Sequence, residues 1–361
     1  MSSYRFVKQI VPMLSFLIMV SAVQLLSQNN LTCYQCKKAI TGKYIIAEGK
    51  TFHPNHFLCA RCNRIIDGNY QYKDGDFYHM DCYAIKEGLI CGYCKKILSG
   101  NYVVYQNKKY HQDCCRNHVL EKCSICGQPL EGEFIIDNFN NRYHAGHKNE
   151  LPECDCCNRL ICKALTGGSK RYSDGRNICN ICYGTAVFDD YQISSLLSKV
   201  KNKLITMGLK IGPNPISIRG VDRNELKRNA KNYSRNTQGY CDSRSDIMTI
   251  NGAVKSKITK HKIMVLNGIP QILMESIIAH ELMHAWIYDN TKNNQDLKTL
   301  EGSCNYIRYL YLKTLLSSQS EQYIQRMNRD PDPAYGTGFR EIRERFEGKR
   351  LDIFLNFLKA D

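Results

Sequence analysis

Cysteine spacing constrains the fold of this chain more than any other feature. Pairs of cysteines separated by two residues recur through the first half, and a second pair of Cys or His with the same gap follows each. A gap of two residues lets both side chains reach one ion from a tight turn, as tetrahedral zinc requires. The sequence therefore predicts five structural zinc sites of four ligands. They are Cys33, Cys36, His53 and His56; Cys59, Cys62, His79 and Cys82; Cys91, Cys94, His111 and Cys114; Cys123, Cys126, His144 and His147; and Cys154, Cys157, Cys179 and Cys182.

A disulfide framework is the alternative use of these cysteines, and an exported chain would permit it. Disulfides would leave the paired histidines without a role, so zinc is the favoured interpretation. Four residues fall outside the repeat and are not expected to be ligands: Cys115, Cys156, Cys162 and His118.

The first two zinc units follow each other directly, as C-x2-C-x16-H-x2-H-x2-C-x2-C-x16-H-x2-C. This pattern resembles a LIM domain, which implies a double zinc knuckle that binds a protein partner and has no chemistry of its own. The recurring pattern C-x2-C-x3-[I/L]-x-G-x-[Y/F] adds a short β-hairpin to each knuckle. We expect a LIM domain at 31–84, a half-LIM module at 88–118 and a degenerate LIM-like domain at 121–184.

The first residues have the composition of an export signal. Arg5 and Lys8 precede an apolar run from Ile10 to Leu26, and small residues follow where cleavage could occur. Residues 1–27 are therefore predicted to be a signal peptide or an N-terminal membrane anchor. Export to a periplasm, the exterior or the outer side of a membrane is expected, and a cytoplasmic location is the alternative. Any membrane contact is expected only through this segment.

The net charge of +16 raises the question of nucleic acid. The excess of basic residues is spread over both halves of the chain, and neither half has a block of Lys and Arg. A DNA or RNA groove needs such a concentration, so nucleic acid is not an expected partner.

The second half has the periodicity of a mixed α+β domain, expected at 185–361. Apolar residues recur on one helical face after residue 189, with Gly208 as a stop. Further helices are predicted at 271–289, 300–318 and 338–359. The runs ISIRGV and KIMVLNG are predicted strands. KIMVLNG could pair with a substrate backbone, or it could be an ordinary sheet strand.

The sequence HELMH lies on the predicted helix 271–289. His280 and His284 are four residues apart and share one helix face, so both imidazoles can bind one metal ion. Glu281 follows the first histidine and can act as general base toward a metal-bound water. The apolar residues around the motif are those of a buried helix.

A catalytic zinc takes three protein ligands and keeps one open position. Glu301 begins the next helical run, EGSCNYIRYLYLK, and can turn back beside the first helix. An acid that stabilises the N-terminus of a helix is the alternative role for Glu301. Asp289 and Asp296 lie in a polar connection, where solvated acids are expected.

The segments QGYCDSRSD, LNGIPQILMESIIAHELMHAW, LKTLEGSCNYI and YGTGFREI, with the LIM pattern, resemble the plant LIM-domain peptidases of the DA-one family. That resemblance implies a gluzincin-like α+β metallopeptidase domain after the zinc modules. It implies His280, His284 and Glu301 as ligands of a catalytic zinc and Glu281 as acid and base. The members of this family are activated by ubiquitin. Whether ubiquitin is also a partner of this chain is not decided by the sequence.

The predicted function is therefore a zinc endopeptidase with one catalytic zinc and about five structural zincs. Its partners are protein substrates and a protein bound by the LIM region. Tyr335, Tyr306 and Arg340 are the candidates for stabilising the oxyanion. Cys241 and Cys304 are expected near one another at the site. The alternative is a catalytically inactive LIM scaffold, which the complete set of Glu281 and three ligands argues against.

Overall fold

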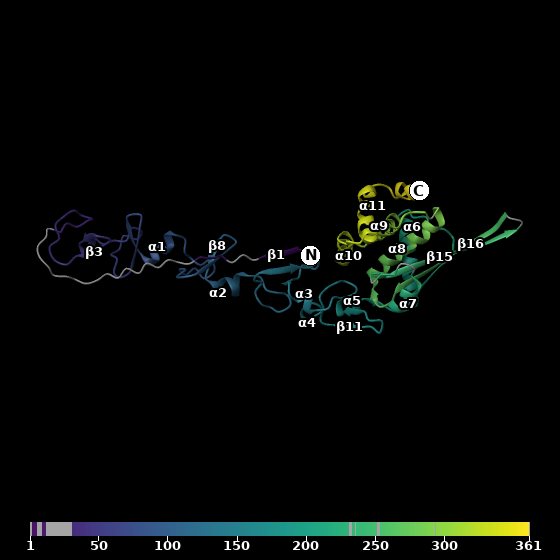
Figure 1. The fold of residues 1–361 in the computed structure, drawn as a ribbon, viewed down its shortest axis with the longest axis horizontal. Coiled ribbons are helices and arrows are strands. Elements are labelled where there is room, and N and C mark those ends of the chain that lie inside the picture. Colours follow the sequence, from purple (N-terminus) through teal and green to yellow (C-terminus); the bar gives the residue numbers. More distant parts are fainter. Residues whose placement is uncertain are drawn as a thin grey trace. The chain divides into compact units, whose positions relative to one another are not determined.

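The computed structural model describes residues 2–5, 9–11, 31–230, 233–234, 236–250, 253–292 and 294–360. It is a mixed α/β structure that divides into two units (Figure 1). We call Tyr4–Cys123 with Gly127–Phe134 the N-terminal unit, and Ile135–Asp361 with the short segments Met1–Ser3 and Ser124–Cys126 the C-terminal unit. The predicted signal or anchor at 1–27 lies outside the described residues except for β1 (Ser2–Arg5) and β2 (Gln9–Val11). In the described part of the chain, no helix is long and apolar enough to cross a membrane.

The N-terminal unit is a series of short antiparallel hairpins. They are β3 (Ile45–Ala47) with β4 (Lys50–Phe52), β5 (Tyr70–Lys73) with β6 (Asp76–His79), and β7 (Tyr102–Tyr105) with β8 (Lys108–Tyr110). β2 pairs with β7. Short helical segments follow the hairpins: η1 (Pro54–His56), α1 (Met80–Lys86), α2 (Gln112–Cys114) and η2 (Cys115–Val119).

The turns of these hairpins follow from their sequence. Glu48 with Gly49, and Asp74 with Gly75, all have positive φ. Two consecutive residues with positive φ are typical of the type I′ turn, whose twist matches that of two paired strands. The core of the first two modules is small and aromatic, with Phe52, Phe57 and Phe77 in mutual ring contact. Such a small core is stabilised by metal in many modules of this size.

The C-terminal unit begins with the last zinc-type modules and continues into a larger domain. The module elements are β9 (Glu133–Ile136), β10 (Arg142–His144), α3 (His147–Glu150), α4 (Lys163–Thr166), β11 (Ser169–Arg171), β12 (Asn177–Cys179) and α5 (Asn180–Tyr183). The larger domain has the strands β13 (Ala186–Val187), β14 (Ile216–Val221), β15 (Gly239–Ile250), β16 (Ala253–Leu266) and β17 (Ile269–Pro270). Its helices are α6 (Asp190–Thr206), α7 (Arg223–Asn229), α8 (Gln271–Asn290), α9 (Leu297–Lys313), α10 (Ser318–Asn328), η3 (Pro333–Thr337), α11 (Gly338–Phe346) and α12 (Leu351–Ala360).

The main sheet of this unit has the order β14-β16-β15. β16 pairs in parallel with β14 and antiparallel with β15, so KIMVLNG contributes to the central strand. Its hydrogen-bonding edges are both occupied, and the hypothesis that it pairs with a substrate backbone is wrong. β15 lies at the edge of the described sheet. The paired ends of β15 and β16 extend from the rest of the unit as a long ribbon (Figure 1).

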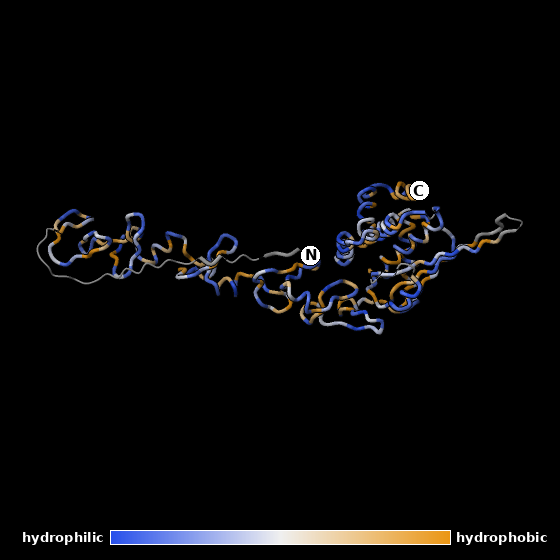
Figure 2. Tube along the Cα trace, viewed as in Figure 1, coloured by the Kyte–Doolittle hydropathy of each residue, from blue (hydrophilic) through white to orange (hydrophobic). Residues whose placement is uncertain are grey.

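One hydrophobic core joins the large domain to the module of Cys154–Cys182. α8 lies within it and is buried on every side from Leu273 to Met283, the pattern of a central helix. The predicted helix 338–359 is two helices, because the chain turns at Gly348, whose φ is +79°. The second of them, α12, is coloured as hydrophobic near the C-terminus in Figure 2, and it buries Phe354, Leu355 and Leu358.

Candidate active site

Two adjacent helices carry the HELMH residues and the predicted third ligand. α8 holds His280 and His284 one turn apart, and α9 packs against α8 with Glu301 in its first turns. α9 begins where the Asp296 carboxylate accepts bonds from the backbone N–H groups of Lys298 and Thr299. Asp296 is therefore the capping acid, and Glu301 is free to face α8.

The three candidate ligand atoms converge. Nε2 of His280 lies 3.1 Å from Nε2 of His284, and Oε2 of Glu301 lies 3.2 Å and 3.4 Å from them. Zinc bonds of 2.0–2.1 Å in a tetrahedron place neighbouring ligand atoms about 3.4 Å apart. The triangle therefore has the dimensions of one face of a tetrahedral zinc site, with the fourth position open.

The chemistry of these atoms also fits a cation. Oε2 of Glu301 is a buried atom that faces the Nε2 atoms of His280 and His284. Burial opposes its ionisation, but the hydrogen bonds of His280 and His284 hold the pKa of Glu301 below its ordinary value. A buried carboxylate is stabilised by a nearby positive charge, and a metal cation bound by this oxygen and the two imidazole nitrogens would supply it. Zinc would be held by His280, His284 and Glu301.

Asn305 orients the first histidine. Its Oδ1 lies 3.0 Å from Nδ1 of His280, while its Nδ2 donates to the carbonyl oxygen of Tyr335 at 2.8 Å. Since the amide oxygen can only accept, Nδ1 carries the proton and Nε2 keeps the lone pair that a metal needs. The orienting role of Asn305 was not predicted from the sequence. Its position one helical turn after Glu301 was the signal that could have indicated it.

Glu281 is buried beside the first residue of β15. A Cβ on Gly239 would lie 2.5 Å from Oε1 of Glu281 and 2.6 Å from Cγ2 of Ile277, so only glycine fits. Burial raises the pKa of Glu281 above its ordinary value, and the neighbouring Glu301 adds to the effect. Such a shift moves a carboxylate toward the range useful for a general base.

A cavity of about 520 Å³ opens onto these residues. Its wall combines β15, α8, α9 and α10, and it includes His280, Glu281, His284, Glu301 and Tyr335. The cavity has room for several residues of a peptide.

The three oxyanion candidates have different places in the structure. Tyr335 lines the cavity and stacks on His280, with the ring centroids 6.1 Å apart. Burial and the charge of Glu301 raise the pKa of Tyr335, so its hydroxyl stays protonated. Tyr306 packs against Tyr309 and Phe354, and Arg340 donates to backbone carbonyls of Asn328 and Asp330. The geometry favours Tyr335.

Cys241 and Cys304 both lie near the site. Cys241 lines the cavity, and Cys304 interacts with His284. The two thiols also interact electrostatically. Burial raises the pKa of Cys241 to about 12 and that of Cys304 to about 11, so both are neutral thiols at physiological pH.

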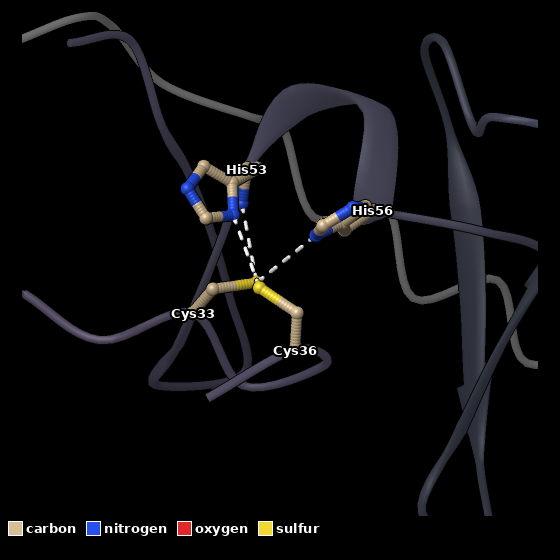
Figure 3. A group of neighbouring side chains, drawn as sticks. All are labelled: Cys33, Cys36, His53 and His56. Carbon is tan, nitrogen blue, oxygen red and sulfur yellow. Dashed lines mark hydrogen bonds between the residues drawn. The ribbon is translucent and has the colours of Figure 1, made fainter. Parts of the chain in front are cut away.

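The five predicted structural zinc groups each gather their ligand atoms within 4.8 Å of one another. They are the sets Cys33, Cys36, His53 and His56; Cys59, Cys62, His79 and Cys82; Cys91, Cys94, His111 and Cys114; Cys123, Cys126, His144 and His147; and Cys154, Cys157, Cys179 and Cys182. Figure 3 shows the first set converging, with Sγ of Cys36 3.5 Å from Nδ1 of His53. The 19 cysteines, which all lie in the described part of the chain, form no disulfide with one another, so the thiols of the five groups can serve as zinc ligands.

Backbone N–H groups favour the thiolate form of Cys33 in the first group. Burial opposes ionisation of Cys33, yet the backbone N–H groups of Cys36 and His53 hold its pKa at about 5. Thiolate is the form that binds zinc. The cysteines and histidine outside the repeat have other surroundings: Cys115 lies in an apolar core, Cys162 accepts the N–H of Leu165, and His118 stacks on Tyr93. Cys156 is buried beside the fifth group.

Comparison with known proteins gives two family matches. The model of the DA1-like family, described as Protein DA1, matches residues 218–327, and that of the LIM domain matches residues 33–87. Protein DA1 of Arabidopsis thaliana is 26% identical over 258 residues, which cover 56% of this chain and 47% of the relative. Protein DA1-related 2 of the same plant is 26% identical over 204 residues, covering 49% and 38%.

A rice relative, the LIM domain-containing protein HDR3 of Oryza sativa subsp. japonica, is 26% identical over 197 residues, covering 47% of this chain and 38% of the relative. The chain thus spans less than half the length of these curated relatives. It has homologues named DA1 and DA1-related, and its Cys/His clusters are consistent with LIM modules.

Proposed function

We propose that this protein is a zinc-dependent endopeptidase whose LIM-type modules bind a protein partner or regulate it. The observation that carries the proposal is the triangle of His280, His284 and Glu301, with edges of 3.1–3.4 Å, at the wall of a peptide-sized cavity. The resemblance to the LIM-domain peptidases of the DA1 family also supports a peptidase function. The C-terminal unit would then hold a gluzincin-like peptidase domain.

The chain's own residues would supply the proton transfers. Zinc bound at the triangle would supply Lewis acidity, which lowers the pKa of water toward about 7 and polarises a carbonyl. Glu281, beside that position, takes the proton of the attacking water and returns it to the leaving amine. The hydroxyl of Tyr335 donates a hydrogen bond to the oxygen that develops negative charge. Asn305 keeps Nε2 of His280 available as a ligand.

The edge strand β15 gives the cavity a place for an extended peptide. Its first residues, Gly239–Cys241, line the cavity next to Glu281, and β15 has an unpaired edge within the described sheet. A substrate backbone that adds to this edge would pass beside the base.

The direct test compares wild-type protein with Glu281→Gln in a casein cleavage assay, with zinc measured in both proteins. The substitution removes the base and preserves the size of the side chain. Cleavage by the wild type and its loss in Glu281→Gln, at equal zinc content, would support the proposal. Equal cleavage by both proteins would overturn the assignment of Glu281, and no cleavage by wild type would favour the LIM scaffold.

A further inference from the structure

Arginine side chains line the part of the cavity away from the metal ligands. Arg308 comes from α9, Arg326 comes from the end of α10, and Arg329 directly follows α10. None of the three has a carboxylate partner within ion-pair distance in the described part of the chain. A cavity wall with several unpaired cations is suited to binding an anion.

Arg308 is partly buried at this wall. Its Nε donates to the hydroxyl of Ser276 at 3.1 Å, which is a neutral acceptor. Burial and the charge of Arg326 together lower the pKa of Arg308 to about 10. The guanidinium still carries its proton at neutral pH. It is therefore a partly buried charge without an ion-pair partner among the described residues, which a ligand anion would stabilise.

Arg326 is fixed at the same wall. Its NH1 donates to the carbonyl oxygen of Cys156 at 2.6 Å, and Arg329 hydrogen-bonds to Asn138. The zinc module of Cys154–Cys182 therefore holds Arg326 in place, and Asn138 holds Arg329. Preorganised donors of this kind bind a carboxylate without a large loss of side-chain entropy.

The cavity also contains acids, and they are engaged elsewhere. Asp332 accepts the N–H groups of Ala334 and Tyr335 at the start of η3, and Asp330 accepts the N–H of Asp332. Glu301 faces the two histidines, and Glu281 lies beside Gly239. Asp330 and Glu281 act on Arg308 electrostatically, but neither forms an ion pair with it.

The spacing of residues along α9 gives the distance between Arg308 and the candidate metal ligand Glu301. Glu301, Asn305 and Arg308 follow one another at four and three residues and share a helix face. At 1.5 Å per residue, Arg308 lies about 10 Å along the axis from Glu301. An extended peptide covers that distance in roughly three residues.

We propose that Arg308 and Arg326 form a subsite that binds a carboxylate of the peptide substrate, two or three residues from the scissile bond. This inference rests on the proposed peptidase function. The carboxylate comes either from an Asp or Glu side chain or from the C-terminus of the peptide. Arg308 would then determine the preference for a substrate with a carboxylate at this position.

The experiment uses pairs of peptides built around the bond that the protein cleaves in casein. The two peptides of a pair are identical except that one has Glu and the other Gln at a single position, which is one of the three positions on either side of that bond. Each peptide is made with a free and with an amidated C-terminus. For the wild type, kcat/KM is expected to be at least about tenfold higher with Glu at one position two or three residues away, or with the free C-terminus. The first result identifies a side-chain carboxylate, and the second identifies a C-terminal one.

Arg308→Met should lower kcat/KM for the favoured peptide more than for its neutral counterpart, so that their ratio approaches one. Lys313→Gln is the matched control, because Lys313 is exposed on the same helix and does not line the cavity; it should keep the ratio. Arg326→Gln provides a second variant if Arg308→Met does not fold. A ratio of one in the wild type, or an unchanged ratio in both arginine variants, would overturn the proposal.

Binding separates this proposal from the peptidase function. Fluorescein-labelled decapeptides with a central Glu or Gln, each with a free or amidated C-terminus, are titrated against the wild type and Arg308→Met by anisotropy. If the wild type cleaves nothing, the proposed function fails. At least about tenfold tighter binding of a carboxylate peptide, lost in Arg308→Met, would still support the anion site. Equal binding of all peptides would contradict it.

Discussion

The side-chain amide of Asn305 connects His280 to Tyr335: its Oδ1 lies 3.0 Å from Nδ1 of His280, and its Nδ2 donates to the carbonyl oxygen of Tyr335. One residue thus fixes the ring of a candidate ligand and the segment that carries the candidate oxyanion donor. The candidate ligand His280 of α8 and the chain before α11 are therefore positioned together.

Asn305→Ala is expected to weaken zinc binding at the catalytic site by about 10–100-fold, because the His280 ring loses the bond that orients it. Competition with a chelator of known zinc affinity measures this change. Asn356→Ala, at an exposed position of α12, is the control and should leave the affinity unchanged. Equal affinity in the two variants would show that His280 needs no support from Asn305.

Gly239→Ala is expected to lower casein cleavage at least about tenfold while zinc content stays the same. The new Cβ would lie 2.5 Å from Oε1 of Glu281, so the carboxylate must move from its position. Gly212→Ala is the control, since its nearest neighbour would be 4.0 Å away. Full activity of Gly239→Ala would mean that the position of Glu281 does not matter for cleavage.

Tyr335→Phe removes one hydroxyl from the cavity wall. We expect kcat to fall by about 10²–10³, the usual cost of losing one oxyanion donor, with zinc retained. Tyr306→Phe should have a small effect on kcat, because Tyr306 packs away from the cavity. A larger loss in Tyr306→Phe than in Tyr335→Phe would reverse the assignment.

Cys179→Ser tests the place of the fifth zinc group. Because Cys179 lies in the same core as α8, losing its zinc should lower the unfolding temperature of the C-terminal unit. Trp286, the single tryptophan, is buried in this core and reports unfolding by fluorescence. Cys36→Ser loses a zinc of the N-terminal unit and should leave the Trp286 transition unchanged. Identical transitions in both variants would contradict the shared core.

The structural zinc groups could be predicted because their ligands are close in sequence. A knuckle and one hairpin bring Cys33 to His56, and the gap of two residues already implies this turn. The helices of HELMH and Glu301 were also predictable, since burial and periodicity define them locally. The predicted end of the second helix at residue 318 is wrong, because α9 ends at Lys313 and α10 begins at Ser318.

Other features depend on contacts between distant segments. The central position of β16 is decided by pairing with β14 and β15, which the sequence of KIMVLNG does not reveal. The packing of Gly239 against Glu281 and the link from Arg326 to Cys156 join residues far apart in the chain. No local pattern indicates such contacts.

The zinc content of purified wild-type protein and of Glu301→Ala, measured together with casein cleavage, tests the central claim most directly. Glu344→Ala, at an exposed position of α11, is the matched control. We predict about six zinc ions per chain in the wild type and the control, and about five without cleavage in Glu301→Ala. About five zinc ions in all three proteins, with no cleavage, would contradict a catalytic metal centre at His280, His284 and Glu301.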